Sequence, residues 1–384
     1  MKTVFYNAKI VTPEIIKDGG VEVDNGKIAR VFRGDDYDKS ANAIDCKGKY
    51  LTPGFVDTHL HEVKAGRLSA HSTEELEKAC MFMAEHGTTA VLPSCGSAPW
   101  DQIQIEFETI KKGMNEDLRG AKVLGGHLEG VFMNKTFAGA QAPNGIHDPV
   151  KEEYMWLLNT GILKRVSASP EIPGALEMGR ILSREGVCMS IAHSAANYDE
   201  VLAAMDNGYN HATHIYNALS YLNNCYYYPQ IGACEAALLH DEITIEAICD
   251  GKHVPKPLLR LMHKIKGADH FQVITDACAS GFAEGEYFDD GHAVVRDGVG
   301  VLADKDVFAG SATTGDVEVK VLMDAGIPFV DVIKMMTLTP AKTIHADSIG
   351  RIAEGYDADI NIIDENYDVV YTMINGKEFK NIMK

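Results

Sequence analysis

Positive charge is scarce in this sequence. Lysine and arginine together number 36 against 55 aspartates and glutamates, which gives a formal net charge of −19 over 384 residues. Nucleic acids and anionic membranes attract cationic surfaces, so neither is expected as a partner of this chain. A small anionic substrate is not excluded, because a local basic pocket can exist on an acidic protein.

Long apolar runs and paired cysteines are also missing. No stretch of about 18 apolar residues occurs, and the first ten residues lack the apolar core of a signal peptide. The eight cysteines stand singly, without a CxxC pair, and several lie within apolar runs. This pattern is typical of reduced cysteines in a protein core. We therefore expect a cytoplasmic protein.

The two ends of the chain carry similar strand patterns. Residues 3–11 and 20–32 alternate apolar and polar side chains, with a hairpin signal at Asn25-Gly26. Residues 359–364 and 369–374 also have strand-like patterns near the other end of the chain. We predict that residues 1–50 and 350–384 together form one small β-sandwich domain.

The middle of the chain alternates strand and helix. Apolar residues recur at helical spacing over 73–86, 174–185 and 199–207, and again over 316–325 and 330–337. Eight strand-like runs lie among them, which is the number that a closed βα barrel needs. The runs are 55–61, 88–93, 122–129, 165–169, 187–193, 210–214, 243–249 and 271–276. The predicted fold class is α/β: a (β/α)8 TIM-like barrel over residues 51–349, with the β-sandwich domain formed by both chain termini.

Two histidines end the first of these runs. Side chains two residues apart on a strand point to the same face, so His59 and His61 can bind one metal ion. Asp57 shares that face, and we assign it a supporting role. The alternative is a pair of surface histidines that follow a strand.

Three further runs end on residues that divalent transition metals prefer as ligands. Glu129 closes the third run, His193 the fifth and His214 the sixth. A carboxylate among imidazoles is a suitable bridge or shared ligand. His127 and His211 lie close to them in sequence, and we predict a supporting or substrate-facing role for His127 and a structural role for His211. Ligands at successive strand ends predict a metal centre at the C-terminal mouth of the barrel.

The eighth run ends on Asp276, and His253 follows the seventh. Hydrolysis at a metal site needs a group that takes a proton from water and returns it to the leaving amine. Asp276, opposite the ligands, could do both. A metal lowers the pKa of its bound water to about 7, so hydroxide is available at neutral pH. His253 could hydrogen-bond a substrate carbonyl oxygen or stabilise the oxyanion. These residues predict a metal-dependent hydrolase.

Taken in order, these segments resemble the amidohydrolase superfamily and, within it, most closely the N-acetylglucosamine-6-phosphate deacetylase family. The similarity covers nearly the whole chain. The matching segments are 53–61 (PGFVDTHLH), 126–130 (GHLEG), 192–194 (AHS), 212–218 (ATHIYNA), 250–254 (DGKHV), 275–277 (TDA), 310–312 (GSA) and 338–341 (LTPA).

The resemblance implies hydrolysis of the N-acetyl amide of N-acetylglucosamine-6-phosphate to glucosamine-6-phosphate and acetate, in a homodimer. It implies a catalytic acid/base, Asp276, and one or two divalent metal ions per subunit, with zinc or iron most consistent with the ligands. The metal ligands would be Glu129, His193 and His214 for the main ion, with His59 and His61 for a second. The substrate contacts would be His253, Asn217, Ala218 and Gln141.

Two segments depart from the family pattern. The family usually has a His-Arg-Glu-Pro-Gly run whose arginine helps clamp the sugar phosphate, whereas residues 223–230 here read NNCYYYPQ, and no lysine or arginine occurs from Tyr216 to Asp250. After the glutamate motif the family often has Lys-Gly-Ala-His, where residues 138–141 here read AGAQ. A phosphate prefers charge-assisted donors, so Lys135, Lys252 or a partner subunit would have to supply them. The tyrosines at 226–228 could stack on a sugar face or form a dimer contact.

Three other interpretations stay open. The chain could deacylate a different or unphosphorylated N-acyl substrate, such as an N-acyl amino acid. It could hydrolyse a cyclic amide, although such members commonly carry a carboxylated lysine at the end of strand four, and residues 164–169 here read KRVSAS with no lysine at the end. It could also be a barrel retained as a non-catalytic scaffold, but such relatives normally lose ligands or the aspartate, and this chain keeps all of them.

Overall fold

Eight parallel strands form a nearly closed barrel in the computed structural model, which describes residues 2–12, 15–34, 36–37, 42–69, 71–225 and 227–383. Around the barrel the order is β6 (Phe55–Leu60), β9 (Thr88–Cys95), β11 (Gly126–Glu129), β12 (Leu163–Ala168), β13 (Cys188–Ile191), β14 (Tyr209–Ala212), β17 (Thr244–Ile248) and β18 (Phe271–Ile274). A short strand, β10 (Lys122–Val123), also pairs with β9. The last strand meets the first where Asp276 N–H donates to the His59 carbonyl oxygen at 2.8 Å. The predicted barrel and all eight of its strands are confirmed.

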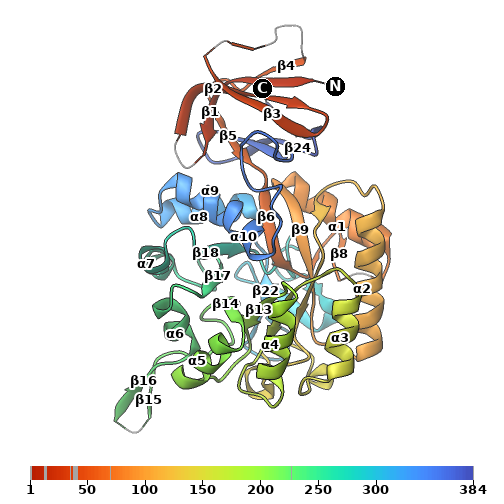
Figure 1. Ribbon diagram of the computed structural model, residues 1–384, viewed down its shortest axis with the longest axis vertical. Coiled ribbons are helices and arrows are strands. Elements are labelled where there is room, and N and C mark those ends of the chain that lie inside the picture. The colour runs from red at the N-terminus through yellow and green to blue at the C-terminus, as the bar shows by residue number, and fades with distance from the viewer. Residues whose placement is uncertain are drawn as a thin grey trace.

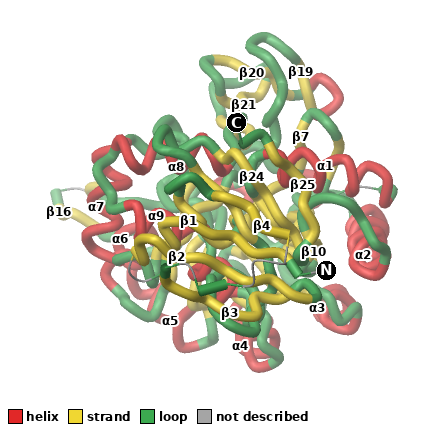
Figure 2. The backbone as a smooth tube through the Cα atoms, turned by 90° about the horizontal axis from the view of Figure 1, so that it is seen from above, coloured by secondary structure: helices red, strands yellow, loops and turns green. Residues whose placement is uncertain are grey.

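Helices connect the barrel strands and surround them (Figures 1 and 2). Polar residues start several of them: the Ser72 hydroxyl accepts from Glu75 N–H at the first helix, and Asn197 and Glu200 cap each other's backbone at another. The helices are α1 (Thr73–Glu85), α2 (Trp100–Asn115), α3 (Lys151–Asn159), α4 (Ala175–Arg184), α5 (Tyr198–Asp206), α6 (Ala233–Leu239), α7 (Lys256–Lys266), α8 (Gly315–Asp324), α9 (Phe329–Met336) and α10 (Leu338–Thr343). Short 3₁₀ turns occur at η1 (Lys135–Phe137), η2 (Pro143–Gly145) and η3 (Asp289–Gly291).

The two ends of the chain share one eight-stranded sheet, at the top of Figure 1. Its path is β25 (Lys377–Asn381), β24 (Val369–Ile374), β23 (Ile360–Ile363), β5 (Tyr50–Pro53), β1 (Thr3–Val11), β2 (Ile15–Asp24) and β3 (Lys27–Arg33), and β4 (Asn42–Asp45) pairs with β1. The hairpin signal at Asn25-Gly26 does join two of these strands, because both residues adopt the left-handed backbone that such a turn requires. This sheet has its own hydrophobic cluster, which includes Phe5, Leu51 and Tyr371. The division into domains at residues 50 and 350 stays our proposal.

Three small β elements were not predicted. A hairpin of β7 (Glu62–Val63) and β8 (Gly66–Arg67) follows the first barrel strand, and β15 (Asn223–Cys225) with β16 (Tyr228–Gln230) projects from the barrel at the lower left of Figure 1. After the last barrel strand comes a four-stranded antiparallel sheet of β19 (Tyr287–Phe288), β20 (Ala293–Arg296), β21 (Val299–Leu302) and β22 (Phe308–Ser311). One signal for this sheet was available, since Asp297-Gly298 is a hairpin dipeptide and both residues are left-handed.

The largest hydrophobic cluster lies between the barrel and its helices. The barrel interior is more polar, and the largest fully buried side chain is Arg165. Among the described residues, no helix is both long and apolar enough to cross a membrane. A polar interior at the C-terminal ends of the strands is where the predicted metal ligands should meet.

Candidate metal centre and active site

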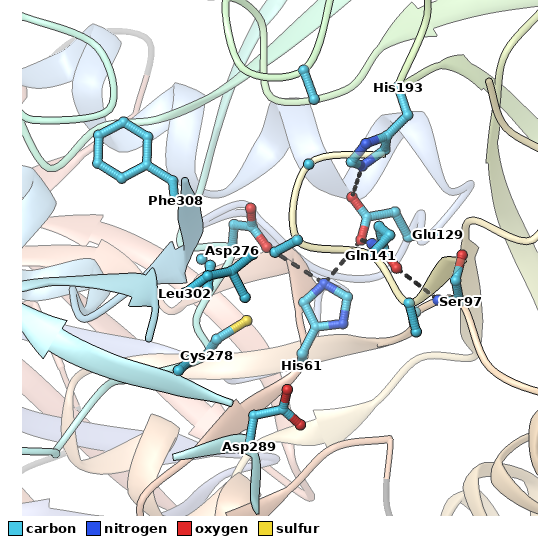
Figure 3. Close-up of a pocket in the computed structure, with 18 of the residues that line it drawn as sticks. His61, Ser97, Glu129, Gln141, His193, Asp276, Cys278, Asp289, Leu302 and Phe308 are labelled. Atoms are coloured by element: carbon cyan, nitrogen blue, oxygen red, sulfur yellow. Dashed lines mark hydrogen bonds and ion pairs between the residues drawn. The ribbon is translucent and has the colours of Figure 1, made fainter. Parts of the chain in front are cut away.

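The side chains predicted to bind metal and catalyse lie together at the C-terminal ends of the barrel strands (Figure 3). His59 lies near the end of β6, His61 directly follows that strand, and Glu129 is the last residue of β11. The other three residues come two positions after β13, β14 and β18. Almost all are nearly inaccessible to solvent, with exposed fractions of 9% or less; His61 is partly exposed. The complete set is His59, His61, Glu129, His193, His214 and Asp276.

The Glu129 carboxylate is the centre of this group. Its Oε1 lies 3.2 Å from His59 Nε2, 3.3 Å from His193 Nε2 and 2.9 Å from His214 Nε2. Its other oxygen, Oε2, lies 3.1 Å from His61 Nε2. One carboxylate therefore touches all four imidazoles that were predicted as ligands.

The three imidazoles that face Oε1 each use Nδ1 for a different acceptor. A carboxylate or a carbonyl oxygen can only accept, so Nδ1 carries a proton, and in the neutral imidazole that binds a metal ion the Nε2 lone pair faces Glu129. The acceptors are the Glu246 carboxylate for His59 (2.7 Å), the Phe137 carbonyl oxygen for His193 (2.9 Å) and the Asn217 carbonyl oxygen for His214 (3.0 Å).

Lone pairs that converge on a carboxylate repel it unless a cation lies between them. Consistent with this, His59 Nε2 is buried and has no hydrogen-bond partner. Among the described residues, three groups of ligand atoms lie close enough to share an ion, and two of these groups contain Glu129: His59, His61 and Glu129, and Glu129, His193 and His214. Imidazole and carboxylate suit a divalent transition metal, so the residues fit one or two such ions, with Glu129 common to both groups.

Asp276 lies on the opposite side of the centre from Glu129's backbone, as Figure 3 shows. Its Oδ1 is 3.4 Å from His61 Nε2 and 3.6 Å from His59 Nε2. Burial raises the pKa of the Asp276 carboxyl, but the positive charge that His59 carries when protonated and a hydrogen bond from His61 outweigh burial and hold this pKa below its usual range. The side chain is therefore ionised and can act as a base.

Three of these residues have a backbone conformation that residues other than glycine rarely adopt. The φ angles are 45° at His193, 28° at His214 and 46° at Asp276, all in the left-handed region. Each follows the end of its barrel strand, where the chain turns sharply. Such strain is typical of sites where surrounding structure fixes a side chain for function.

A pocket of about 570 Å³ opens above the centre, and all four predicted substrate residues line it. Asn217 and Ala218 lie on the turn after β14. The His253 Nδ1 lies 2.7 Å from the Asp250 carboxylate, and its ring packs 4.3 Å from that of Phe308, so the imidazole is held firmly. The His253 Nε2 is buried without a partner, which leaves it available to a bound molecule.

Gln141 contacts the metal centre directly. Its Nε2 donates to Glu129 Oε2 at 2.7 Å, and its Oε1 accepts from the backbone N–H of Ser97 at the same distance. The side chain thus orients the central carboxylate as well as lining the pocket. Its predicted contact with substrate stays a prediction.

The histidines and aspartate assigned supporting roles are all buried in the barrel. Asp57 accepts from the Thr275 hydroxyl at 2.5 Å and ties the first strand to the last. The imidazole of His127 lies between two serine hydroxyls, at 2.8 Å from each, and is not part of the pocket lining. His211 lies 3.2 Å from Glu246, the same carboxylate that receives His59. Of the two predicted roles for His127, the structure therefore favours the supporting role over the substrate-facing one.

Arg67 lines the pocket, and it was not predicted from the sequence. Among the described residues of the lining, it is the only arginine or lysine. Its Nε lies 2.8 Å from Glu62, and a terminal nitrogen lies 3.8 Å from both Asp289 and Asp290. Burial raises the pKa of Glu62, although Arg67 opposes that shift. No motif marks an arginine in a two-residue strand, so the sequence held no signal for this position.

Neither lysine proposed as a phosphate donor lines the pocket. Lys252 donates to the carbonyl oxygens of Asp297 and Gly298, and Lys135 lies in the 3₁₀ turn η1.

Cys278 differs from the predicted core cysteines. It is half-buried in the pocket, with its sulfur within 4.8 Å of the ligand atoms of His61 and Asp276. The other cysteines whose side chains are described are buried, as predicted.

The chain belongs to the amidohydrolase family, whose model matches residues 50–379. With the ligand clusters of the barrel mouth, this membership makes the protein a hydrolase of a metal-dependent class.

Particular deacetylases are similar over nearly the full length. The N-acetylglucosamine-6-phosphate deacetylase of Lysinibacillus sphaericus is 29% identical over 361 residues, covering 93% of this chain and 92% of the relative. The N-acetylgalactosamine-6-phosphate deacetylase of Escherichia coli O157:H7 is 28% identical over 332 residues, covering 85% and 87%. The crystal structure of N-acetylglucosamine-6-phosphate deacetylase from Pasteurella multocida superposes with a TM-score of 0.92 at 27% identity, covering 99% of this chain and 100% of that one.

Proposed function

We propose that the protein hydrolyses the N-acetyl amide of N-acetylglucosamine-6-phosphate to give glucosamine-6-phosphate and acetate. The observation that carries this proposal is the position of Asp276 beside two metal-ligand groups at the base of one pocket. Similarity to deacetylases of amino sugar 6-phosphates supports the substrate class.

We assign Glu129, His193 and His214 to one divalent ion, and Glu129 with His59 and His61 to a second. Such an ion polarises the amide carbonyl and lowers the pKa of water, which makes hydrolysis possible at neutral pH. Zinc or iron(II) suits ligands of this kind.

Asp276 moves the proton. Its carboxylate accepts a proton from the attacking water as the water oxygen bonds to the acyl carbon. It then gives the same proton to the sugar nitrogen as the carbon–nitrogen bond breaks, so acetate and a free amine leave. The aspartate ends the cycle ionised, as it began.

His253 and the turn after β14 hold the substrate. Asp250 accepts from His253 Nδ1 and holds the ring in place, so that the free Nε2 is available to a polar group of the substrate. Asn217 and Ala218 line the same wall of the pocket as His214 and can contact the sugar or its acetyl group.

We propose that Arg67 receives the 6-phosphate. Its Nε forms a close ion pair with Glu62 at 2.8 Å, whereas its terminal nitrogen lies 3.8 Å from Asp289 and Asp290, so the terminal N–H groups remain available. Arginine is well suited to phosphate because two parallel N–H groups can bind two of its oxygens.

A second candidate is hydrolysis of an unphosphorylated N-acyl substrate. The observation in its favour is that three carboxylates, Glu62, Asp289 and Asp290, already surround Arg67. If they neutralise it fully, the pocket offers a phosphate little attraction.

The test is amine release by metal-replete protein from N-acetylglucosamine-6-phosphate, its galacto epimer and both unphosphorylated sugars. Turnover of the gluco 6-phosphate in preference to the other three supports the proposal. Turnover confined to unphosphorylated sugars would replace the proposal with the second candidate, and no turnover of any N-acetyl sugar would refute both.

We propose that the protein is a homodimer joined through the projecting β15–β16 hairpin. Tyr227 is 92% exposed and Tyr228 75% exposed, and Tyr221 and Leu222 beside them are exposed as well; Tyr226 lies outside the described residues. Aromatic side chains of this kind are enriched at interfaces. Light scattering of the wild type and of Tyr227→Ser/Tyr228→Ser tests this: a dimer that the variant converts to monomer is expected, and a wild-type monomer would refute it.

We also propose a cytoplasmic location. The seven cysteines whose side chains are described are all free thiols, as a reducing compartment would keep them. Fractionation of cells that express the protein would test this, and recovery in an extracellular fraction would contradict it.

A further inference from the structure

A charged network lies directly behind the metal centre. Glu246, on β17, is 0% exposed and does not line the pocket. Its Oε1 accepts from His59 Nδ1 at 2.7 Å. Its Oε2 accepts from Arg165 at 2.6 Å, from Gln272 at 2.9 Å and from His211 at 3.2 Å. Both oxygens are therefore fully used by donors inside the barrel.

A buried carboxylate is costly unless it is paired and hydrogen-bonded. Arg165, also 0% exposed, supplies the opposite charge and is itself held by the Thr58 carbonyl and hydroxyl oxygens at 3.4 and 3.2 Å. Since Thr58 immediately precedes His59 in β6, the arginine binds both the carboxylate and the strand that carries the ligand. This arrangement fixes Glu246 relative to the His59 ring.

The two metal-ligand groups are supported in different ways. His193 and His214 donate from Nδ1 to neutral backbone carbonyls of Phe137 and Asn217. His59 alone among these three donates to an anion, which makes its Nε2 a stronger electron donor and holds it towards Glu129 at 3.2 Å. The same Glu246 Oε1 also accepts from the backbone N–H of His214, but at the longer distance of 3.4 Å, so a change at Glu246 should act first on the side chain of His59.

We propose that Glu246, held by Arg165, is the positioning residue that fixes the tautomer and orientation of His59 and thereby determines whether the His59–His61 half of the centre holds a metal ion. This inference rests on the two-ion assignment in the proposed function. It concerns metal occupancy, so it can be tested without any substrate.

The first test is metal content after equilibrium dialysis against limiting zinc, measured by mass spectrometry. Glu246→Gln keeps the shape of the side chain but removes its charge. We expect the zinc affinity of the His59–His61 half to fall roughly 10–100-fold, so that the variant retains one ion per chain where the wild type retains two. A well-folded Glu246→Gln protein that keeps two ions with unchanged affinity would overturn the proposal.

The matched control is Glu318→Gln. Glu318 is another buried carboxylate, 1% exposed, whose Oε1 accepts from the Cys249 backbone N–H at 2.8 Å and which contacts no proposed ligand. Burial raises the pKa of Glu318, and Glu318→Gln keeps the size and shape of the side chain. This variant should keep two ions, and loss of one from it as well would assign the effect to general damage and overturn the proposal.

Glu246→Gln leaves Arg165 without a counter-charge and could fail to fold. The double variant Glu246→Gln/Arg165→Met removes both charges and should show the same loss of one ion. A measurement on the wild type needs no variant: long-range ¹H–¹⁵N spectra of histidine-labelled, zinc-loaded protein should place the His59 proton on Nδ1. A proton on Nε2 would overturn the proposal whatever the variants do.

Failure of this inference and failure of the proposed function give different results. If the wild type binds two ions and Glu246→Gln binds one, but no N-acetyl sugar is hydrolysed, the positioning role stands and the proposed substrate falls. If the wild type hydrolyses the sugar phosphate but binds a single ion, the substrate stands and the positioning role falls.

Discussion

The floor of the pocket and its rim are built from different parts of the fold. The floor, which consists of the predicted metal ligands with Asp276, lies at the ends of barrel strands that hydrogen bonds hold on both sides. The rim, consisting of Arg67, Glu62, Asp289 and Phe308, lies on short hairpins outside the barrel. Floor residues are almost completely buried, whereas the Arg67 and Asp289 side chains are 42% and 57% exposed.

This difference separates chemistry from specificity. A barrel fixes the direction of every side chain at its strand ends, so the floor can hold ions and move a proton with little reorganisation. The rim is free to change in length and charge without disturbing the barrel. Changes to the floor should therefore affect the chemical step or the metal, and changes to the rim should affect which substrate binds.

The largest effect should come from Asp276→Asn. The amide cannot accept the proton from water, so kcat should fall by at least about 10³-fold. Metal content, measured by mass spectrometry, should stay as in the wild type because the ligands are untouched. The matched rim variant, Asp289→Asn, should leave kcat within about twofold. A fall in kcat of the same size in both variants would erase the distinction between floor and rim.

A smaller effect should follow from Gln141→Leu. This change removes the hydrogen bond to Glu129 Oε2, and the affinity for metal should fall by roughly 10–100-fold, the usual consequence of losing a residue that orients a ligand. Competition with a chromophoric chelator would measure the affinity. Gln102→Leu is the control, since Gln102 also lines the pocket but is exposed. Unchanged metal affinity in Gln141→Leu would mean that Gln141 serves the substrate alone.

Much of the floor could be predicted because strand ends follow a simple rule. His59 and His61 share a face through the two-residue period of a strand, and Glu129 ends an apolar run. Glu246 obeys the same period, but a glutamate inside an apolar strand carries no signal for a partner far away in sequence. Only the closed barrel brings its carboxylate within 2.7 Å of a histidine 187 residues earlier.

The rim could not be predicted for a different reason. Its strands are two to four residues long, too short for a hydrophobic period to appear. The β19–β22 sheet, which brings Phe308 against His253, left a single hairpin signal in the sequence. The sequence showed that the usual arginine was missing, whereas the position of Arg67 in the pocket became apparent from the fold.

The rim prediction with the larger effect is Arg67→Met. If Arg67 binds the 6-phosphate, KM for N-acetylglucosamine-6-phosphate should rise roughly tenfold, the equivalent of about 1.4 kcal/mol for one partly exposed charge-assisted contact. kcat and metal content should not change. Lys64→Met is the control, because Lys64 lies on the same hairpin but pairs with Glu286 outside the pocket lining. Equal KM values for wild type and Arg67→Met would remove Arg67 from phosphate recognition.

The smallest effect should have the opposite sign. Asp289→Asn removes one of the exposed carboxylates that compete for Arg67, so KM for the 6-phosphate should fall about twofold, as expected for an exposed ion pair. This fall in KM should disappear in the Arg67→Met background, because no guanidinium remains for Asp289 to occupy. A double-mutant cycle from initial rates would show this, and an improvement that persists without Arg67 would mean that Asp289 repels the phosphate directly.

The β7–β8 hairpin joins the floor to the rim through its backbone. Leu68 N–H, one residue beyond Arg67, donates to the carbonyl oxygen of His61 at 2.8 Å. If His61 binds a metal ion and Arg67 binds the phosphate, as proposed, the ion that holds His61 in place also holds Arg67, and the anion at Arg67 steadies His61 in return. Thermodynamic linkage makes the two effects equal: whatever factor the metal adds to the affinity for a 6-phosphate, that ligand adds to the affinity for the metal. Cofactor retention and substrate supply in this enzyme are then one coupled equilibrium, and an enzyme working on its substrate would resist chelation better than one at rest.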